Sequence, residues 1–376
     1  MTDDLTPSLY VHIPFCRSKC PYCGFFSTTA TASLPAFLKA LHGEMDFYRE
    51  DFRYFDTLYL GGGTPSLLTA DDLSALLAAV TTRFTLLPQA EITLEANPAD
   101  LDRPYLHALR RLGINRLNIG IQSFDDNILR FLGRRHDRRQ AILAIEAARE
   151  AGFENLGLDL IYGVPGQDIG PWLENLHQAL SFRPAHLSCY QLTMEPHTPL
   201  QIRHLKDDFS LPDEDGLSDF FFQTSATLRE AGYLHYEISN FAVNEASLSR
   251  HNQKYWRHAP YLGLGPSAHS FLGNKRWWNH RDVGAYTDSV ARDLPPREAE
   301  EVLTPDQLRL EAWLLGVRTR RGIDLKDFQR RYNYEILVEK GPNLRSMAEK
   351  RLLEIRDGFL RPTLAGMAVA DSLALL

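Results

Sequence analysis

Short apolar runs alternate with longer amphipathic segments through the first half of the chain. Runs of this kind are typical of strands that are buried on both faces of a sheet. They cover residues 9–13, 57–61, 91–97, 116–122, 156–163 and 186–192. The segments between them have the pattern of helices, and Thr69 and Asp72 stand at capping-box spacing where one of them begins. This alternation predicts an α/β chain with parallel β/α units that form a partial (β/α)6 barrel like a TIM barrel.

Polar or glycine-rich features stand at matching ends of the successive runs. A cysteine-rich loop follows the first run, and GGGTP (61–65) follows the second. Glu95 and Asn97 end the third run, Gln122 ends the fourth, and Asp159 lies in the fifth. In barrels of parallel strands the chemistry takes place at the carboxyl ends of the strands, so we expect these residues to share one site.

The pattern loosens after about residue 200. A helix is expected near 213–231, and residues 250–270 are dense in aromatic residues, His and Gly. From Thr304 onward the pattern is helical, including residues 344–356, and GFLRPT (358–363) is expected to form a β-wing. A small, mainly helical and winged-helix-like domain is therefore predicted at the C-terminus. The predicted domains are a core at 1–235, a connecting region at 236–300 and an accessory domain at 301–376.

Composition and charge exclude some classes of function. The formal net charge of −7 argues against a nucleic-acid partner, which needs a basic face. The basic residues near 130–139 are expected to be a solvated helix face. No apolar run has the length of a membrane span, and the acidic start MTDD is unlike a signal peptide, so a cytoplasmic protein is expected.

Cysteine spacing is the strongest chemical signal in the chain. Of four cysteines, Cys16, Cys20 and Cys23 lie within eight residues, as CRSKCPYC. A redox dithiol is disfavoured because GFFSTT is a poor helix opening, and a zinc site lacks a second cysteine pair. Attachment of c-type haem needs His after CxxC, and residue 24 is Gly. Three thiolates on one loop suit a four-iron cluster with one open iron. The fourth cysteine, Cys189, lies in an apolar run and is expected to be an inert buried thiol.

This loop, following a strand, resembles the cluster loop of radical S-adenosylmethionine (SAM) proteins. In that superfamily, SAM chelates the open iron through its amino and carboxylate groups. The motifs YVHIPFC, GGGTPS, EANP, NIGIQSF, LGRRH and DLIYGVPGQ extend the likeness over essentially the whole chain. Together they resemble the oxygen-independent coproporphyrinogen III oxidase family, which implies a radical SAM barrel.

The resemblance implies a role for particular residues. The iron ligands of a [4Fe–4S] cluster would be Cys16, Cys20 and Cys23. The residues in contact with SAM would be Tyr10, Tyr22, Gly62, Gly63, Thr64, Glu95, Gln122, Arg134 and Asp159. Glycine lets backbone groups approach a ligand closely, and a carboxylate such as Glu95 suits a cationic sulfonium.

Two departures separate this chain from the oxidases of the family. Their fourth cysteine, two positions after the third, is replaced by Phe25, and only nine residues precede Tyr10, where they carry a longer extension. HNQKYW (251–256) instead matches the HNxxYW motif of haem chaperones in this family. The match implies His251 as a haem ligand, with Tyr255 and Trp256 against the porphyrin. The alternative ligands would be His258, His269 and His280.

The resulting interpretation is a haem chaperone that holds a SAM-liganded [4Fe–4S] cluster and transfers haem to an acceptor protein. The family implies an acceptor among respiratory or other haem proteins, including ones at the membrane surface. The alternative is an oxygen-independent coproporphyrinogen III oxidase, a decarboxylating enzyme. A third interpretation is an iron–sulfur protein with a vestigial porphyrin site. The sequence assigns no catalytic residue and leaves cleavage of SAM open.

Overall fold

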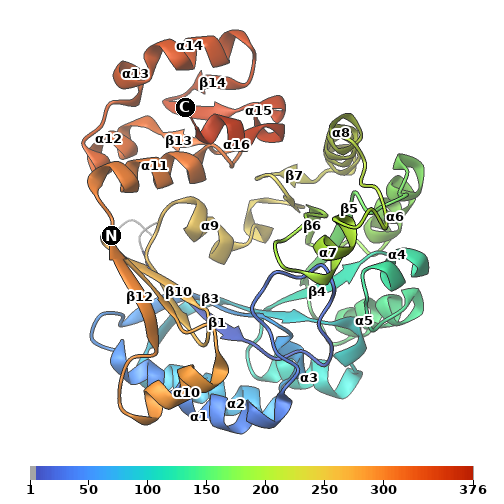
Figure 1. The fold of residues 1–376 in the computed structure, drawn as a ribbon, viewed down its shortest axis with the longest axis vertical. Coiled ribbons are helices and arrows are strands. Elements are labelled where there is room, and N and C mark those ends of the chain that lie inside the picture. The colour runs from blue at the N-terminus through green and yellow to red at the C-terminus, as the bar shows by residue number, and fades with distance from the viewer. Residues whose placement is uncertain (1–5, 376) are drawn as a thin grey trace.

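The computed structural model of the chain describes residues 6–375. Six parallel strands form the centre of its main sheet, in the order of the sequence (Figure 1). They are β1 (Ser8–Ile13), β2 (Tyr54–Gly62), β3 (Thr85–Ala96), β4 (Arg116–Gln122), β5 (Asn155–Tyr162) and β6 (His186–Gln191). Each coincides with an apolar run, so the predicted parallel strands and the partial-barrel fold class are confirmed.

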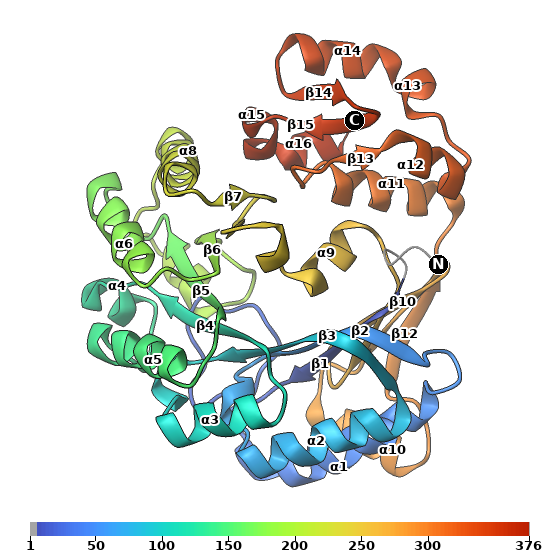
Figure 2. The ribbon, with the colours of Figure 1, turned by 180° about the vertical axis from the view of Figure 1, so that it is seen from behind.

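Helices alternate with these strands and cover the outer face of the curved sheet, as Figures 1 and 2 show from opposite sides. They are α1 (Leu34–Glu44), α2 (Ala70–Arg83), α3 (Arg103–Arg111), α4 (Asp126–Phe131), α5 (Arg138–Glu150) and α6 (Ile169–Ser181). The capping box predicted from Thr69 and Asp72 is present at the start of α2. Leu9, Leu58 and Leu94 are among the fully buried residues of the core between the sheet and the helices.

The sheet extends beyond the predicted strands at both edges. Next to β1 lie β9 (Tyr261–Leu264), β10 (His269–Leu272), β11 (Lys275–Asn279) and β12 (Arg297–Val302). Next to β6 lie β8 (Asn240–Ala242) and β7 (Leu234–His235). Except for β9, which is parallel to β1, the added strands pair antiparallel. Three further helices belong to this part of the chain: α7 (Pro199–His204), the predicted α8 (Glu214–Glu230) and α10 (Val283–Ala291).

The C-terminal region has its own hydrophobic core, which includes Trp313, Val317 and Phe328. Its helices are α11 (Pro305–Gly316), α12 (Leu325–Tyr332), α13 (Ile336–Glu339), α14 (Gly341–Glu349), α15 (Leu364–Ala368) and α16 (Ala370–Ala374). Its small sheet has the order β13 (Ile323–Asp324), β15 (Phe359–Pro362) and β14 (Leu353–Arg356). The predicted wing is thus strand β15.

The helix predicted over residues 344–356 is wrong in its second half. Helix α14 ends at Glu349, and Arg351 has a positive φ of 57°, which a continuing helix does not allow. Residues 353–356 then pair with β15 as strand β14. Leu352 and Ile355 fit the period of a helix, whereas Leu353 and Ile355 fit that of a strand, and pairing with the adjacent strand decides between the two.

Helix α9 (Arg250–Trp256), which carries HNQKYW, lies between the main sheet and the C-terminal helices (Figures 1 and 2). It contacts β2 on one side and α11 on the other. Within residues 6–375, no helix is long and apolar enough to cross a membrane. The domain boundaries predicted at 235 and 300 stay predictions.

Candidate functional site

The cysteine loop leaves β1 and closes on itself before α1. The Cys16 amide donates to the Thr28 carbonyl over 3.0 Å, and the Thr28 amide donates to the Pro14 carbonyl over 2.7 Å. Cys16 is buried, Cys20 and Cys23 are half-buried, and all three are free thiols. A short loop with closed ends thus presents three thiols on one side of the barrel mouth.

Hydrogen-bond donors from the segment after β2 and from the segment between α4 and α5 reach two of these sulfurs. The Thr64 hydroxyl donates to Cys16 Sγ over 3.3 Å, and Arg134 Nη1 donates to Cys20 Sγ over 3.5 Å. Burial raises the pKa of the Cys23 thiol, and the neighbouring charges of Cys20 and Cys16 add to the rise. Among the residues the structure describes, no three His, Cys, Asp or Glu side chains converge on one point as ligands of a single ion do. Ligands of a cluster each bind a different iron, whereas the ligands of a zinc ion share one centre.

The glycines of GGGTP bring the end of β2 against this loop. The amides of Gly63 and Thr64 each donate over 2.8 Å to the carbonyls of Ile13 and Phe15. Gly62 has a φ of +109°, and a Cβ there would lie 2.6 Å from His12 Nδ1. The glycines therefore serve this close backbone approach, which sets Thr64 beside Cys16.

Two half-buried carboxylates follow along the same barrel end. Glu95 accepts hydrogen bonds from the Tyr59 hydroxyl (2.7 Å) and the Gly62 amide (3.2 Å). Burial raises the pKa of Glu95 to about 7, the Tyr59 bond opposes the rise, and Asp159 adds to it. Asp159 accepts two hydrogen bonds from Asn118 Nδ2, of 3.0 and 3.1 Å, and burial raises its pKa to about 6. Two neighbouring acids favour a cationic group between or beside them.

Arg134 joins the end of β4 to the cysteine loop. Its Nη2 donates to the Gly120 carbonyl over 2.7 Å, and its Nη1 also lies 3.4 Å from the Tyr22 hydroxyl. Gln122 ends β4 with a positive φ of 66°. Within the described part of the chain, Gln122 Oε1 and Arg134 Nε are buried without a hydrogen-bond partner. Buried unpartnered polar atoms at a site are typical of groups that a ligand or water satisfies.

Side chains that the sequence analysis missed complete this end of the barrel. The His12 ring donates from Nε2 to the Phe26 carbonyl (2.8 Å), so its Nδ1 accepts from the Tyr10 hydroxyl (2.9 Å). Tyr10 pairs in register with Tyr59, the donor to Glu95. His12 lies two residues after Tyr10, so the period-2 pattern of a strand could have assigned it to the same face.

His251 lies at the barrel side of α9 and is almost fully buried. Its Nδ1 is 3.0 Å from Thr57 Oγ1, and its Nε2 is 3.0 Å from the Tyr255 hydroxyl. The centre of its ring lies 4.9 Å from that of Tyr59. Burial lowers the pKa of the imidazole to about 3, so the ring is neutral and one of its two nitrogens has a lone pair that suits a metal. To bind iron through Nε2, the ring must release Tyr255.

Two acids from the barrel hold α9 in place. Glu91 accepts hydrogen bonds from the amides of Arg250 (3.1 Å) and His251 (3.0 Å) at the start of the helix. Asp56 accepts from Lys254 Nζ over 2.8 Å. Negative charge at a helix N-terminus is favourable, so Glu91 fixes both the helix and the position of His251.

The alternative histidines lie apart from His251. His258 is buried just after α9, with Nδ1 2.9 Å from the Tyr332 hydroxyl. His269 stacks on Trp278 in the added strands, and His280 follows β11. Cys189 is buried in β6, and burial raises the pKa of its thiol. The thiol therefore stays protonated, which is its unreactive form.

Comparisons with known proteins agree with this geometry. Residues 10–179 match the Radical SAM superfamily, and residues 303–369 match the HemN C-terminal domain. The chain is similar to a solved structure of coproporphyrinogen III oxidase (HemN) from Escherichia coli, with a TM-score of 0.84 and 25% identity over 99% of this chain and 90% of that one. The fold and the first domain are those of a radical SAM protein.

Curated relatives narrow the class. The chain is 36% identical to the heme chaperone HemW of Synechocystis sp., covering 84% of this chain and 78% of the relative. It is 34% identical to the heme chaperone HemW of Bacillus subtilis, covering 92% of each. It is 33% identical to the mitochondrial radical S-adenosyl methionine domain-containing protein 1 of Bos taurus, covering 98% of this chain and 86% of the relative. The chain belongs to the HemW family of radical SAM proteins.

Proposed function

We propose that this chain is a haem chaperone that holds a SAM-liganded [4Fe–4S] cluster, binds haem through HNQKYW and transfers it to a haem protein. Membership of the radical SAM superfamily implies the cluster and SAM. Haem and its transfer are proposed from the names of the HemW relatives.

The cysteine loop fits a cluster. Its three thiols are free, and donors from Thr64 and Arg134 reach two of the sulfurs. Hydrogen bonds to sulfur stabilise thiolate ligands and tune the potential of a cluster. We assign Cys16, Cys20 and Cys23 as ligands. When bound, a reduced cluster supplies an electron to the sulfonium of SAM; the protein orients the cofactor and excludes water and oxygen.

The acids and unpartnered groups beside the loop fit SAM. A buried carboxylate attracts a sulfonium or ammonium strongly because few waters screen it, so we assign Glu95 and Asp159 to the cationic parts of SAM. Gln122 Oε1 and Arg134 Nε, each buried without a partner among residues 6–375, have hydrogen-bonding capacity left for the ligand. The assignment also includes Tyr10, Tyr22 and the segment 62–64.

The observation that carries the haem proposal is the contact of His251 with Tyr59. Their ring centres are 4.9 Å apart, and Tyr59 donates to Glu95 over 2.7 Å. The haem motif and the assigned SAM site therefore belong to one buried cluster of side chains. A chaperone that couples its cofactor to haem loading needs such a contact, whereas an unrelated loop histidine does not.

An anaerobic haem titration of the cluster-reconstituted protein, followed at the Soret band, tests this function. We expect saturable binding that weakens at least about 10-fold in His251→Ala, because an axial ligand is lost. His235→Ala is the matched control, since it also removes a buried, doubly hydrogen-bonded imidazole. Absence of saturable binding by the wild type contradicts haem binding, and equal effects of the two variants contradict the assignment of His251. Transfer is then measured as movement of bound haem to haem-depleted membranes.

A second candidate function is oxygen-independent oxidation of coproporphyrinogen III, favoured by the similarity of the whole chain to HemN. At the position of the fourth cysteine of the oxidases, Phe25 is 69% exposed. Turnover of coproporphyrinogen with SAM and a reductant, followed by release of carbon dioxide, tests it. We expect none.

A further inference from the structure

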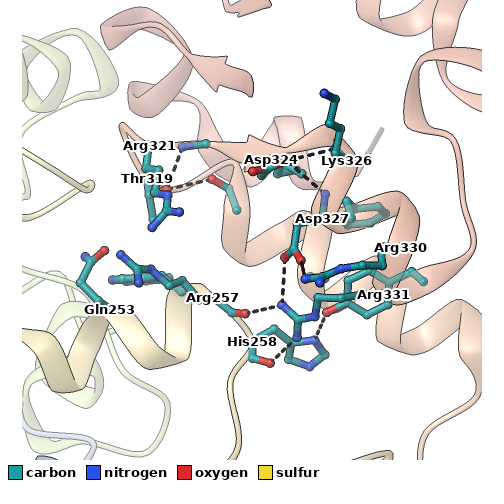
Figure 3. A pocket seen from close by; sticks show the side chains of 17 residues that line it. Gln253, Arg257, His258, Thr319, Arg321, Asp324, Lys326, Asp327, Arg330 and Arg331 are labelled. Atoms are coloured by element: carbon teal, nitrogen blue, oxygen red, sulfur yellow. Dashed lines mark hydrogen bonds and ion pairs between the residues drawn. The ribbon is translucent and has the colours of Figure 1, made fainter. Parts of the chain in front are cut away.

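A cavity of about 400 Å³ lies between α9 and the C-terminal region (Figure 3). The end of α9 forms one wall, and the segment from the end of α11 through α12 forms the other. In Figure 3 the Gln253 side chain rises from α9 toward Thr319 and Arg321, and Asp327 and Arg330 border the opposite side. This cavity is on the side of α9 that faces away from the barrel.

The cavity is lined by more basic than acidic side chains. Its two acids already have partners in α12. Asp324 accepts hydrogen bonds from the amides of Lys326 (3.0 Å) and Asp327 (3.1 Å), and Asp327 forms an ion pair with Arg330. The five basic residues of the lining are Arg257, Arg321, Lys326, Arg330 and Arg331. An excess of positive charge in a concave site attracts anions.

Two unpartnered groups in the α9 wall point to the same ligand chemistry. Gln253 Nε2 and Trp256 Nε1 are buried and have no hydrogen-bond partner within residues 6–375. Both groups are donors, and the indole N–H is donor only. The rings of Trp256 and Tyr332 add flat apolar surface to the lining. Donors, cations and aromatic faces together suit a flat molecule that carries carboxylates.

We propose that this cavity binds the propionate carboxylates of haem. The proposal rests on the proposed function, and it holds whichever histidine binds the iron. HNQKYW then has two uses. His251 and Tyr255 share the face toward the barrel, whereas Gln253 and Trp256 line the cavity. The motif thereby joins recognition of the iron to recognition of the carboxylates. The carboxylates distinguish haem from an uncharged porphyrin ester.

Titration with haem and with haem dimethyl ester, in the same detergent, tests the proposal. The ester keeps the iron and the ring but has no anionic carboxylates. We expect the wild type to prefer haem by about 10-fold or more, since hydrogen bonds to charged groups are lost with the ester. Lys326→Glu and Gln253→Leu should each lose most of this preference while the Soret maximum stays where it is. Glu near the start of α12 suits the helix dipole, so Lys326→Glu should fold.

Lys39→Glu is the matched control, because it reverses an exposed charge on α1, away from the cavity. It should keep the full preference for haem. Equal binding of haem and ester by the wild type, or a preference that survives in both cavity variants, overturns the cavity proposal and leaves haem binding intact. Absence of saturable binding of either compound overturns the proposed function and the cavity proposal together.

Discussion

The two polar regions on either side of α9 have opposite charge and differ in exposure. On the barrel side, Glu95 and Asp159 are half-buried acids held by short hydrogen bonds from their neighbours. On the C-terminal side the lining has more basic than acidic residues, and the Arg330 side chain is 70% exposed. One short helix therefore separates a half-buried acidic site from a more exposed basic one.

This difference indicates which ligand each region suits. Half-buried acids held in place interact more strongly with a cation than exposed side chains do, because fewer waters screen them. Exposed cations interact weakly and in a salt-dependent way, but they tolerate a ligand that must later leave. A cofactor that stays bound needs the stronger kind of interaction, and a ligand that is transferred needs the weaker kind. Variants on each side should therefore affect one ligand and spare the other.

The largest effect is expected from the cysteine loop. Cys20→Ala removes a proposed iron ligand and the sulfur that accepts from Arg134, so the reconstituted protein should lose its cluster. Iron and sulfide content and the visible absorption of the cluster measure this loss. The preference for haem over its ester should remain, because the cavity does not include this loop. Cys189→Ala is the control; if it loses as much iron as Cys20→Ala, the assignment of the loop is wrong.

Glu95→Gln should weaken SAM binding by about 10- to 100-fold, the usual cost of losing one partner of a buried charge pair. Because burial raises the pKa of Glu95 to about 7, the wild-type carboxyl is neutral below that pH and ionised above it. SAM affinity of the wild type should therefore rise as the pH passes upward through 7. In Glu95→Gln the rise through pH 7 should be absent, and only a rise at lower pH, near the pKa of about 6 of Asp159, should remain. Calorimetric titrations across this range measure both effects.

Glu237→Gln is the matched control, because burial also raises the pKa of Glu237 to about 7. Its carboxyl accepts from the Ser239 amide and has no contact with the assigned SAM site. This variant should keep both the affinity and its dependence on pH. A rise through pH 7 that persists in Glu95→Gln would refute the assignment of Glu95.

The sequence predicted the parallel half of the fold because each buried strand is a continuous apolar run. It missed the edges of the sheet, where β7 has two residues and β8 has three, too few for a periodic pattern. Strands β10 to β12 pair antiparallel and are only partly buried, and β12 has no buried residue, so they lack apolar runs. Long, doubly buried strands are visible in a sequence, and short or half-exposed ones are not.

The candidate site was predicted to the same uneven degree. Glu95 and Gln122 were proposed because they lie at the ends of apolar runs and Asp159 because it interrupts one, which are properties of the chain itself. Tyr59 was missed because its importance comes from register: it pairs with Tyr10 on one side and Thr93 on the other. Tyr255 and Trp256 were expected on one surface, but consecutive residues of a helix point about 100° apart. Only the observed packing of α9 shows which side each ring faces.

Tyr59→Phe should have a smaller effect than Glu95→Gln, because it removes one hydrogen bond and keeps the ring against His251. SAM affinity should fall by about 3- to 10-fold. The Tyr59 bond lowers the pKa of Glu95, so its loss should move the pH dependence of SAM binding to higher pH. Tyr105→Phe also removes a single hydroxyl bond, to the Leu68 carbonyl, and should change neither quantity. An unshifted pH profile in Tyr59→Phe contradicts the proposed link between this tyrosine and the cofactor.

Salt should separate the two regions without any substitution. Raising the ionic strength from about 0.1 M to about 1 M shortens the screening length from about 10 Å to about 3 Å. The preference for haem over its dimethyl ester should fall by about 2- to 5-fold, because the exposed cations of the cavity are screened. SAM affinity should change less, since Glu95 and Asp159 are half-buried and are screened less than exposed side chains. If salt weakens SAM binding more than the preference for haem, this difference in exposure between the two regions is wrong, because the acids would then be the groups in fuller contact with solvent.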